Sequence, residues 1–186
     1  MRPDMISGFS EDFFDVLRAE APWERIPNTP RSECFMAVDT ALTYSYGNDN
    51  QRRTRVYVAK PMHPVARALM DRINGELGCA NNVCVGNLYD NEHDHLGWHA
   101  DDSPEQDAAH PIAVVSFGAE RFIWVKPRGA KGDVPLEDRF LLTVGSLFVM
   151  PPGFQDTMLH RIPKHDRPCG PRLSLTYRKL DRAVGR

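Results

Sequence analysis

The sequence predicts an α+β fold in which a few helices back an antiparallel β-sandwich or jelly roll. Segments with helical character come first, and strand-like segments dominate after residue 78. These later segments are short, rich in β-branched and aromatic residues, and separated by turns of Gly, Pro and Asp. A doubly wound fold is disfavoured because helices do not alternate with the later strands.

Two helices are expected in the first part of the chain. Ser10 can cap the first helix, which Pro22 ends or closely follows. The second helix covers residues 63–78. Its apolar stripe recurs every four residues, at Val65, Leu69, Ile73 and Leu77. Residues 22–54 are expected to be irregular, and residues 55–60 alternate as a strand does.

Six further strands are expected in the second half of the chain. They cover residues 83–89, 112–117, 121–126, 140–144, 146–150 and 172–178. Close spacing of such short strands is typical of a sandwich or jelly roll. At 186 residues, the chain is expected to form one domain, residues 1–186.

Composition disfavours several classes of protein. A charged content of 26% and a net charge of −2 provide no overall attraction to nucleic acid or membrane. The apolar runs are far shorter than the ~20 residues of a membrane span, and the N-terminal residues do not resemble a signal peptide. The four cysteines form no CxxC pair, which disfavours structural zinc. We expect a cytoplasmic protein with no membrane partner.

Charge is unevenly distributed along the chain. Residues 90–107 contain seven acids and no Lys or Arg, whereas residues 160–186 contain eight Lys or Arg and two Asp. Such segregation is compatible with a site that holds a cation on one side and an anionic ligand on the other. Two solvated loops of opposite sign would give the same pattern.

His99 and Asp101 are the strongest candidates for metal ligands. On a strand, residues i and i+2 point to the same face, so both side chains can reach one ion. The third ligand has to come from a neighbouring strand, and His160, in a strand-like stretch, is the best candidate. Two His and one carboxylate leave open positions on the metal, which suits Fe(II) and O2 chemistry.

A rival pair of histidines, His93 and His95, also lies two residues apart. This pair falls in a polar turn, whereas His99 follows a strand-like segment directly. The context therefore favours His99, although a His-x-Asp pair alone is common by chance.

The last strand predicts a site for an anionic ligand. One face of it carries only polar residues, namely Arg172, Ser174, Thr176 and Arg178. The other face is apolar and looks buried. Two guanidinium groups on such a strand need anionic partners, which a dicarboxylate could supply. The alternative is that they pair with the acids of residues 90–107.

Taken together, these residues resemble the AlkB-type Fe(II)/2-oxoglutarate dioxygenases, from about Pro30 to Lys179. The motifs that carry the resemblance are Asn87-Leu-Tyr89, Gly97-Trp-His-Ala-Asp-Asp102, Ser116-Phe-Gly118, His160 and Arg172 to Arg178. Their order and intervals are those of the family. Two positions depart from the repair-type pattern: Ser103 stands in place of Glu, and Ser174 in place of Asn. Neither change removes a metal or carboxylate ligand.

The resemblance implies a double-stranded β-helix (jelly-roll) core with N-terminal helices packed on one sheet. It assigns about residues 1–54 to an N-terminal helix and a nucleotide-recognition lid, and about residues 55–182 to the catalytic core. It further implies that Fe(II) is held by His99, Asp101 and His160.

Co-substrate binding is also implied by the resemblance, with 2-oxoglutarate and O2 as co-substrates. Asn87 and Tyr89 would hydrogen-bond 2-oxoglutarate, and Thr176 would line its pocket. Arg172 would pair with the distal carboxylate, and Arg178 would sit by the carboxylate that chelates iron. Asn87 and Tyr89 are two residues apart on an expected strand, so they should point the same way.

The activity implied is oxidative removal of alkyl groups from nucleobases in DNA or RNA, with release of formaldehyde, succinate and CO2. The target base would be single-stranded or flipped. The chain would act in DNA repair as a monomer, with access to the nucleoid or nucleus. The residues assigned to the substrate are Phe35, Tyr44, Tyr46, Trp98 and Asp102. Residues 47–55 add three arginines suited to phosphate contacts.

Three alternatives remain open at the level of sequence. Phe35 and Tyr44 could simply pack in a core. The oxygenase could act on a protein, a lipid or a small molecule, because the metal and co-substrate residues do not specify the substrate. A non-catalytic β-sandwich binding module would leave the His and Asp residues incidental.

Overall fold

Two helices cover one face of the larger sheet in the computed structural model, which describes residues 12–27, 29–46 and 55–181. They are α1 (Asp12–Glu20) and α2 (Pro64–Leu77). The ring of His63 accepts a hydrogen bond from the Val65 N–H, and Gly78 ends α2 in the left-handed conformation. The helix expected over residues 63–78 is therefore confirmed; Ser10 lies outside the described residues.

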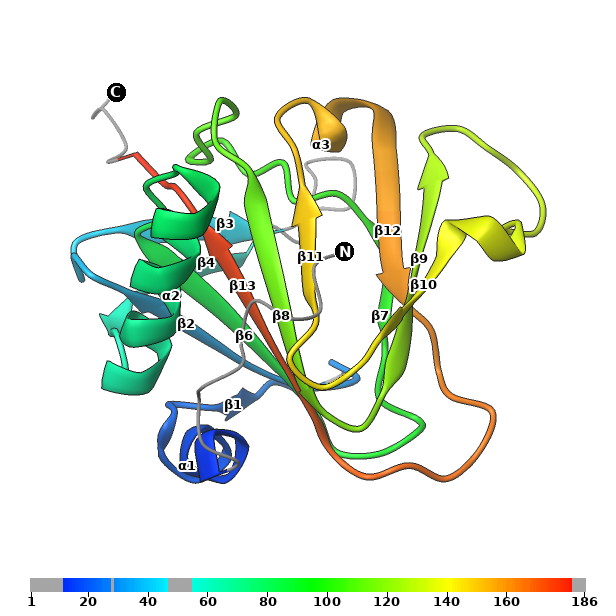
Figure 1. The fold of residues 1–186 in the computed structure, drawn as a ribbon, viewed down its shortest axis with the longest axis horizontal. Coiled ribbons are helices and arrows are strands. Elements are labelled where there is room, and N and C mark those ends of the chain that lie inside the picture. The colour runs from blue at the N-terminus through cyan, green and yellow to red at the C-terminus, as the bar shows by residue number, and fades with distance from the viewer. Residues whose placement is uncertain (1–11, 28, 47–54, 182–186) are drawn as a thin grey trace.

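The larger sheet forms the middle layer of the molecule. Among the described residues it has seven strands: β1 (Glu24–Arg25), β2 (Ser32–Ala37), β6 (Val83–Tyr89), β13 (Arg172–Arg178), β8 (Ile112–Gly118) and β11 (Leu147–Met150) in spatial order, with β5 (Lys60–Pro61) beside β2. Figure 1 shows α2 lying across this sheet, on the side away from the smaller sheet.

A smaller sheet faces the larger one and completes the sandwich. Its described strands are β10 (Arg139–Leu142), β9 (Arg121–Pro127), β12 (Met158–Ile162) and β7 (Leu96–His99) in spatial order. The short helices η3 (Leu136–Asp138) and α3 (Phe154–Thr157) precede β10 and β12. Two facing sheets, antiparallel except for the β2–β5 pair, and backed by helices agree with the expected α+β jelly roll.

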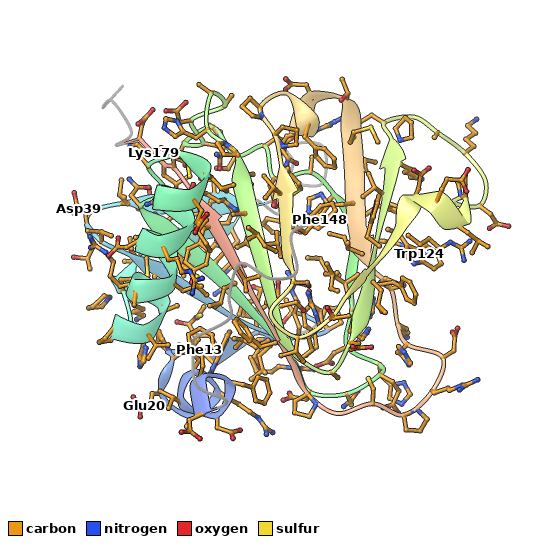
Figure 2. The ribbon with its side chains drawn as sticks, viewed as in Figure 1. Phe13, Glu20, Asp39, Trp124, Phe148 and Lys179 are labelled. Carbon is orange, nitrogen blue, oxygen red and sulfur yellow. The ribbon has the colours of Figure 1, made fainter. Side chains whose placement is uncertain are left out.

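The alternation of each strand divides the core into two layers. Leu173, Leu175 and Tyr177 of β13 pack with α1 and α2 residues on the helical side of the larger sheet. Between the two sheets lies a second cluster that includes Phe148, and Figure 2 shows this ring in the interior of the sandwich. The polar face of β13 therefore points into the space between the sheets.

Residues 22–54 are not irregular as expected, because they contribute β1, β2 and a further strand. All six residues of β2 are buried, and β2 pairs with β6 along its whole length. The strand β3 (Thr43–Tyr46) pairs with β4 (Arg55–Val58) as a separate hairpin. A strand buried on both faces shows no polar alternation, and its flanking prolines read as loop signals. Residues 47–54 lie outside the described structure.

Gly86 of β6 has a packing role. A Cβ atom at this position would lie 2.5 Å from the Cys34 sulfur and 2.9 Å from the Trp23 ring. Only glycine allows the chain around Trp23 to approach the sheet this closely. As for membranes, none of the helices in the described residues is long and apolar enough to span one.

Candidate metal centre and its pocket

Three of the predicted ligands converge between the two sheets. His99 is the last residue of β7 and lies directly opposite His160 of β12 in the register of the sheet. Asp101 lies in the loop after β7, not on the strand as the spacing argument assumed. One ligand atom from each residue lies within 4.8 Å of the others, and this is the one metal-competent group found among the described His, Cys, Asp and Glu residues.

Orientation of the two imidazoles favours a metal between them and the carboxylate. The Nε2 atoms of His99 and His160 lie 3.5 and 3.6 Å from the two oxygens of Asp101. His99 Nδ1 lies 2.9 Å from the Gly97 carbonyl oxygen, which can only accept, so the proton of the neutral ring is on Nδ1. The Nε2 lone pair of His99 is thereby free for a metal.

Burial and neighbouring charges hold these residues in the protonation states that a metal needs. Burial, together with the neighbouring His99, lowers the pKa of His160 to about 3, and burial also lowers the pKa of His99. For Asp101, burial opposes ionisation, but Arg178 and the two histidines outweigh it and lower the pKa. Neutral imidazoles beside a carboxylate are the metal-binding forms.

Two residues position Asp101, and one of them, Gln155, is identified by no sequence pattern. Gln155 of α3 accepts a 2.8 Å hydrogen bond from the Asp101 N–H through its side-chain oxygen. The Arg178 guanidinium lies 2.9 Å from Asp101 Oδ1. The acid-rich segment and the basic C-terminal strand therefore meet at the metal site. For Arg178, the alternative of pairing with an acid of residues 90–107 is correct.

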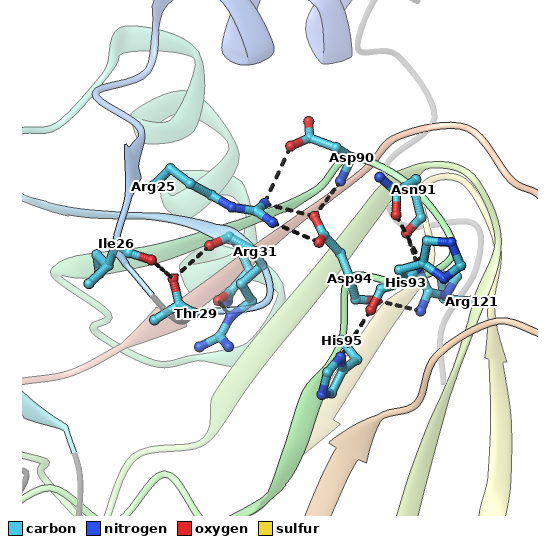
Figure 3. Close-up of polar contacts among 11 residues, drawn as sticks. Arg25, Ile26, Thr29, Arg31, Asp90, Asn91, His93, Asp94, His95 and Arg121 are labelled. Atoms are coloured by element: carbon cyan, nitrogen blue, oxygen red, sulfur yellow. Dashed lines mark hydrogen bonds and ion pairs between the residues drawn. The ribbon is translucent and has the colours of Figure 1, made fainter.

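The rival histidines lie elsewhere, in the turn between β6 and β7. Figure 3 shows that Asp94, between them, binds Arg25 through both carboxylate oxygens, each at 2.9 Å, and also accepts from the Asp90 N–H. The His93 side chain is 77% exposed. This turn is a structural element, and neither His93 nor His95 belongs to the metal-competent group.

The predicted co-substrate residues share the inner face of the larger sheet. Asn87 and Tyr89 of β6 lie opposite Ser174 and Arg172 of β13 in the strand register. One pocket, with an empty volume of about 530 Å³, is lined by both Asn87 and Tyr89 and by the metal group. Thr176 and Arg178 line the same pocket. The chain thus brings the candidate metal ligands and all the predicted co-substrate residues except Arg172 to one cavity.

Arg172 lies at the far end of β13, behind Tyr89. Its side chain is fully buried, and its guanidinium carbon lies 5.1 Å from the centre of the Tyr89 ring. Its Nε donates a 2.9 Å hydrogen bond to the Ser116 hydroxyl, but the two terminal nitrogens have no partner within the described part of the chain. Burial lowers the pKa of Arg172 to about 10.

A buried polar cluster next to Asn87 was missed by the sequence reasoning. Arg31 donates a 2.6 Å hydrogen bond to the Asn87 side-chain oxygen and forms an ion pair with Glu33. Tyr57 donates to the other oxygen of Glu33. Alternation of Cys34 and Met36 could have identified β2 and placed Glu33 on its inner face.

The predicted substrate residues fall into three groups. Tyr44 and Tyr46 line the pocket; the Tyr44 hydroxyl accepts a 2.6 Å bond from Arg178, and the Tyr46 ring packs edge-on, 6.1 Å from the His99 ring. Trp98 and Asp102 lie at the entrance to the metal site. Phe35 is buried beside Tyr44 in a packing cluster and does not line the pocket.

The entrance is a separate hollow, which we call the mouth. Its lining includes Tyr46, His99, Trp98, Asp102 and Arg128. The Asp102 carboxylate pairs with Arg128. Asp102 is therefore already occupied by a cation, which qualifies its predicted role as an acceptor for a base amine.

The residues present fit Fe(II) and 2-oxoglutarate. Two imidazoles and one carboxylate form the donor set that suits ferrous iron with open positions. On the same sheet face, the partnerless terminal nitrogens of Arg172 offer two charge-assisted donors for a carboxylate. The metal group and this guanidinium thus lie on the same side of the larger sheet, with Tyr89 between Arg172 and the pocket.

Comparison with known proteins agrees with this geometry. A family model described as the 2OG-Fe(II) oxygenase superfamily matches residues 10–178. The solved structure described as "The structure of OsALKBH1" has a TM-score of 0.56 and 14% identity and covers 92% of both chains. A 2OG-Fe(II) oxygenase family structure from Burkholderia pseudomallei has a TM-score of 0.50 and 15% identity, over 90% of this chain and 77% of that chain. At these identities the two structures speak for the fold alone.

Sequence relatives are closer. The human "Alpha-ketoglutarate-dependent dioxygenase alkB homolog 3" is 36% identical over 89% of this chain and 60% of the relative. The mouse "DNA oxidative demethylase ALKBH2" is 33% identical over 82% of this chain and 63% of the relative. The chain therefore spans about 60% of the length of these relatives. With the family match and the site geometry, the chain belongs to the 2OG-Fe(II) oxygenase superfamily, among its AlkB-type members.

Proposed function

We propose that this chain is an Fe(II)- and 2-oxoglutarate-dependent dioxygenase that removes alkyl groups, methyl above all, from nucleobases. The observation that carries the oxygenase part is that the His99–Asp101–His160 group shares one pocket with Asn87 and Tyr89, while the Arg172 guanidinium lies behind Tyr89 on the same sheet. The nucleic-acid part is supported by relatives that are named DNA oxidative demethylases.

When bound, Fe(II) with 2-oxoglutarate and O2 supplies the oxidising power that hydroxylates an N-linked methyl carbon, after which formaldehyde leaves and succinate and CO2 are released. The protein positions the reactants and excludes water. Arg172 binds the distal carboxylate of 2-oxoglutarate, and Asn87 and Tyr89 orient it. Apolar side chains of the pocket wall, Leu96, Ile123 and Ile162, keep solvent away from the reacting atoms.

Tyr44 and Tyr46 guide the target base toward the metal. The Tyr46 ring and His99 both line the pocket and the mouth, so a base that enters through the mouth meets this ring beside the metal group. A flipped or single-stranded base fits such a route, because an aromatic wall replaces the lost stacking.

The chain acts as a monomer in DNA repair, in the cytoplasm or nucleus where nucleic acid is found.

The test is formaldehyde release from methylated single-stranded DNA and RNA, with Fe(II), 2-oxoglutarate and O2 supplied. The wild-type chain should release formaldehyde and succinate in equal amounts, and His99→Ala should release neither. His93→Ala is the matched control, since this exposed histidine lies outside the metal-competent group and should retain turnover. Succinate formation without formaldehyde from any oligonucleotide would instead favour a protein, lipid or small-molecule substrate.

A further inference from the structure

A continuous row of alternating arginines and tryptophans crosses the outer face of the smaller sheet. Arg139 of β10 lies opposite Trp124 of β9, and Trp124 lies opposite Arg161 of β12. Because His160 pairs with His99, Trp98 of β7 lies beside Arg161. Figure 2 shows Trp124 on the side of the molecule away from α1 and α2. We call these four residues, with Lys126, the cation–indole row.

Each neighbouring pair in the row is in cation–π contact. The guanidinium carbons of Arg139 and Arg161 lie 4.3 and 4.2 Å from the centre of the Trp124 ring. On the other side, Arg161 lies 4.9 Å and the Lys126 ammonium 4.6 Å from the Trp98 ring. All five side chains are half-buried, so each keeps part of its surface open to a ligand. The row extends across all four strands of this sheet.

Positive charge in the row is not neutralised from within the protein. Lys126 and Arg139 donate their hydrogen bonds to backbone carbonyls, and Arg161 Nε has no partner. In the described part of the chain, none of the three forms an ion pair with a carboxylate, although Glu137 and Asp138 directly precede Arg139. Burial, together with the nearby Arg139, lowers the pKa of Arg161. Three like charges without counter-charges favour an anionic partner.

The row is continuous with the entrance to the metal site. Trp98, at one end of the row, also lines the mouth, together with Tyr46 and His99. Leu159, which lies opposite Lys126 in the sheet register, lines the mouth as well. A polymer with one unit in the pocket therefore has its neighbouring units next to Trp98.

We propose that the cation–indole row is a track that holds a single-stranded polynucleotide beside the base in the pocket. Bases stack on the exposed parts of the two indoles, and the three cations contact phosphates. Alternating aromatic and cationic groups are the usual surface for single-stranded nucleic acid, where every base offers a ring and every unit a charge. This inference rests on the proposed function, because that function brings a nucleic acid to the mouth.

The test compares a variant lacking the three charges, Lys126→Gln/Arg139→Gln/Arg161→Gln, with Arg67→Gln on the exposed face of α2. Binding of an unmethylated fluorescent oligothymidylate of ~15 nucleotides, a length able to cover several stacking sites, is measured by anisotropy at several salt concentrations. We expect the triple variant to bind at least about tenfold more weakly, with a salt slope lower by ~0.7 for each phosphate that its side chains no longer reach. Arg67→Gln should bind as the wild type does.

Intrinsic fluorescence gives an independent readout of stacking. The chain has three tryptophans, and Trp23 packs against the core on the helical side of the larger sheet. Oligothymidylate should quench Trp98 and Trp124 but not Trp23, so the Trp98→Phe/Trp124→Phe variant should lose the quenching. If the triple variant does not fold, Lys126→Glu alone, at the Trp98 end, should still weaken binding several-fold.

Three results would overturn the track: unchanged binding by the triple variant, equal weakening by Arg67→Gln, or no quenching of Trp98 and Trp124. These results differ from a failure of the proposed function. Row-dependent binding without formaldehyde release would leave the track intact and reject the dealkylase. Full demethylation activity in the triple variant would reject the track and leave the dealkylase intact.

Discussion

The two arginines of β13 lie at opposite ends of the strand and differ in their partners. Arg178 is 2.9 Å from a carboxylate oxygen of Asp101 and donates to the Tyr44 hydroxyl. Arg172 donates to the neutral Ser116 hydroxyl and lies against the Tyr89 ring, but among the described residues it pairs with no carboxylate. The Arg178 end of the strand is therefore charge-compensated in advance, whereas the charge at the Arg172 end is balanced only by an anionic ligand.

This difference has an energetic consequence. A buried charge without a counter-charge costs several kcal/mol, even after the surroundings relax. The free protein bears this cost at Arg172, and a carboxylate that binds there removes it. Binding energy for the co-substrate is thus built into the fold as an unsatisfied group, and Fe(II) and 2-oxoglutarate together should raise the melting temperature more than Fe(II) alone.

The largest expected effect comes from removing the Asp101 carboxylate, which balances the charge of Arg178. Asp101→Asn removes the anionic metal ligand and leaves Arg178 without its carboxylate, so turnover should fall at least about a thousandfold. Iron content of the purified protein and formaldehyde release are the measurements. Asp102→Asn is the matched control, since this neighbour is exposed, pairs with Arg128 and should leave the iron content unchanged. Full iron occupancy in Asp101→Asn would contradict the assignment.

The second prediction concerns Arg172, whose charge no described carboxylate balances. Arg172→Met should raise the 2-oxoglutarate concentration needed for half-maximal turnover by roughly a hundredfold, because charged hydrogen bonds of about 1.5–3 kcal/mol each are lost. Iron affinity should change only a few-fold. The ligand-free variant should also melt at a higher temperature than the wild type, because a buried unpaired charge has been replaced by an apolar chain.

Arg121→Met is the control for that stabilisation. Arg121 is equally buried, but its guanidinium donates to the backbone carbonyls of Asp94 and Pro163. Its removal should lower the melting temperature, since those buried carbonyls lose their donors. If both substitutions destabilise the protein alike, Arg172 is not the unsatisfied group that the geometry indicates.

The residues on the inner faces of the two sheets could largely be predicted from the sequence. The structure of the lid segment could not. A strand period of two is enough to place Arg172, Thr176 and Arg178 together and to predict the apolar reverse face. The strands at residues 83–89 and 172–178 match β6 and β13 at both ends. Sequence context selected His99 over the rival His93–His95 pair, because the rivals fall in a polar turn.

The failures share a physical origin in contacts between distant segments. Residues 32–37 form a strand that is buried on both faces, so polar and apolar residues do not alternate along it, and the only signal in this proline-rich region is the recurrence of Cys34 and Met36. Gln155 contacts Asp101 across 54 residues of sequence, and Arg31 contacts Asn87 across 56. Phe35 is a further case: an aromatic residue in the lid segment was assigned to the substrate, but it packs beneath Tyr44.

A third prediction sharpens the role of Arg178. Tyr44→Phe removes the hydroxyl that accepts from this guanidinium, without removing the charge beside Asp101. Groups that orient a metal ligand indirectly are typically worth ~10-fold or more in metal affinity, and Tyr44 acts one residue further away. We therefore expect a three- to tenfold weaker Fe(II) affinity, measured by anaerobic titration. Tyr46→Phe is the control, since the described residues offer its hydroxyl no hydrogen bond; an equal loss there would exclude a specific role for Tyr44.

The smallest expected effect tests the one side-chain partner of Arg172. Ser116→Ala removes the hydroxyl that accepts from Nε, so the guanidinium is held less firmly behind Tyr89. A loss of about 1 kcal/mol corresponds to roughly a fivefold rise in the 2-oxoglutarate requirement. Ser146→Ala is the matched control, because this buried hydroxyl has no partner in the described part of the chain and its loss should be neutral or slightly stabilising. A fivefold shift for Ser116 with none for Ser146 would show that Arg172 binds the co-substrate best when its own orientation is fixed. If Ser116→Ala leaves the 2-oxoglutarate requirement unchanged, burial alone positions Arg172. Arg172 and Arg178 then differ only in whether a carboxylate balances their charge.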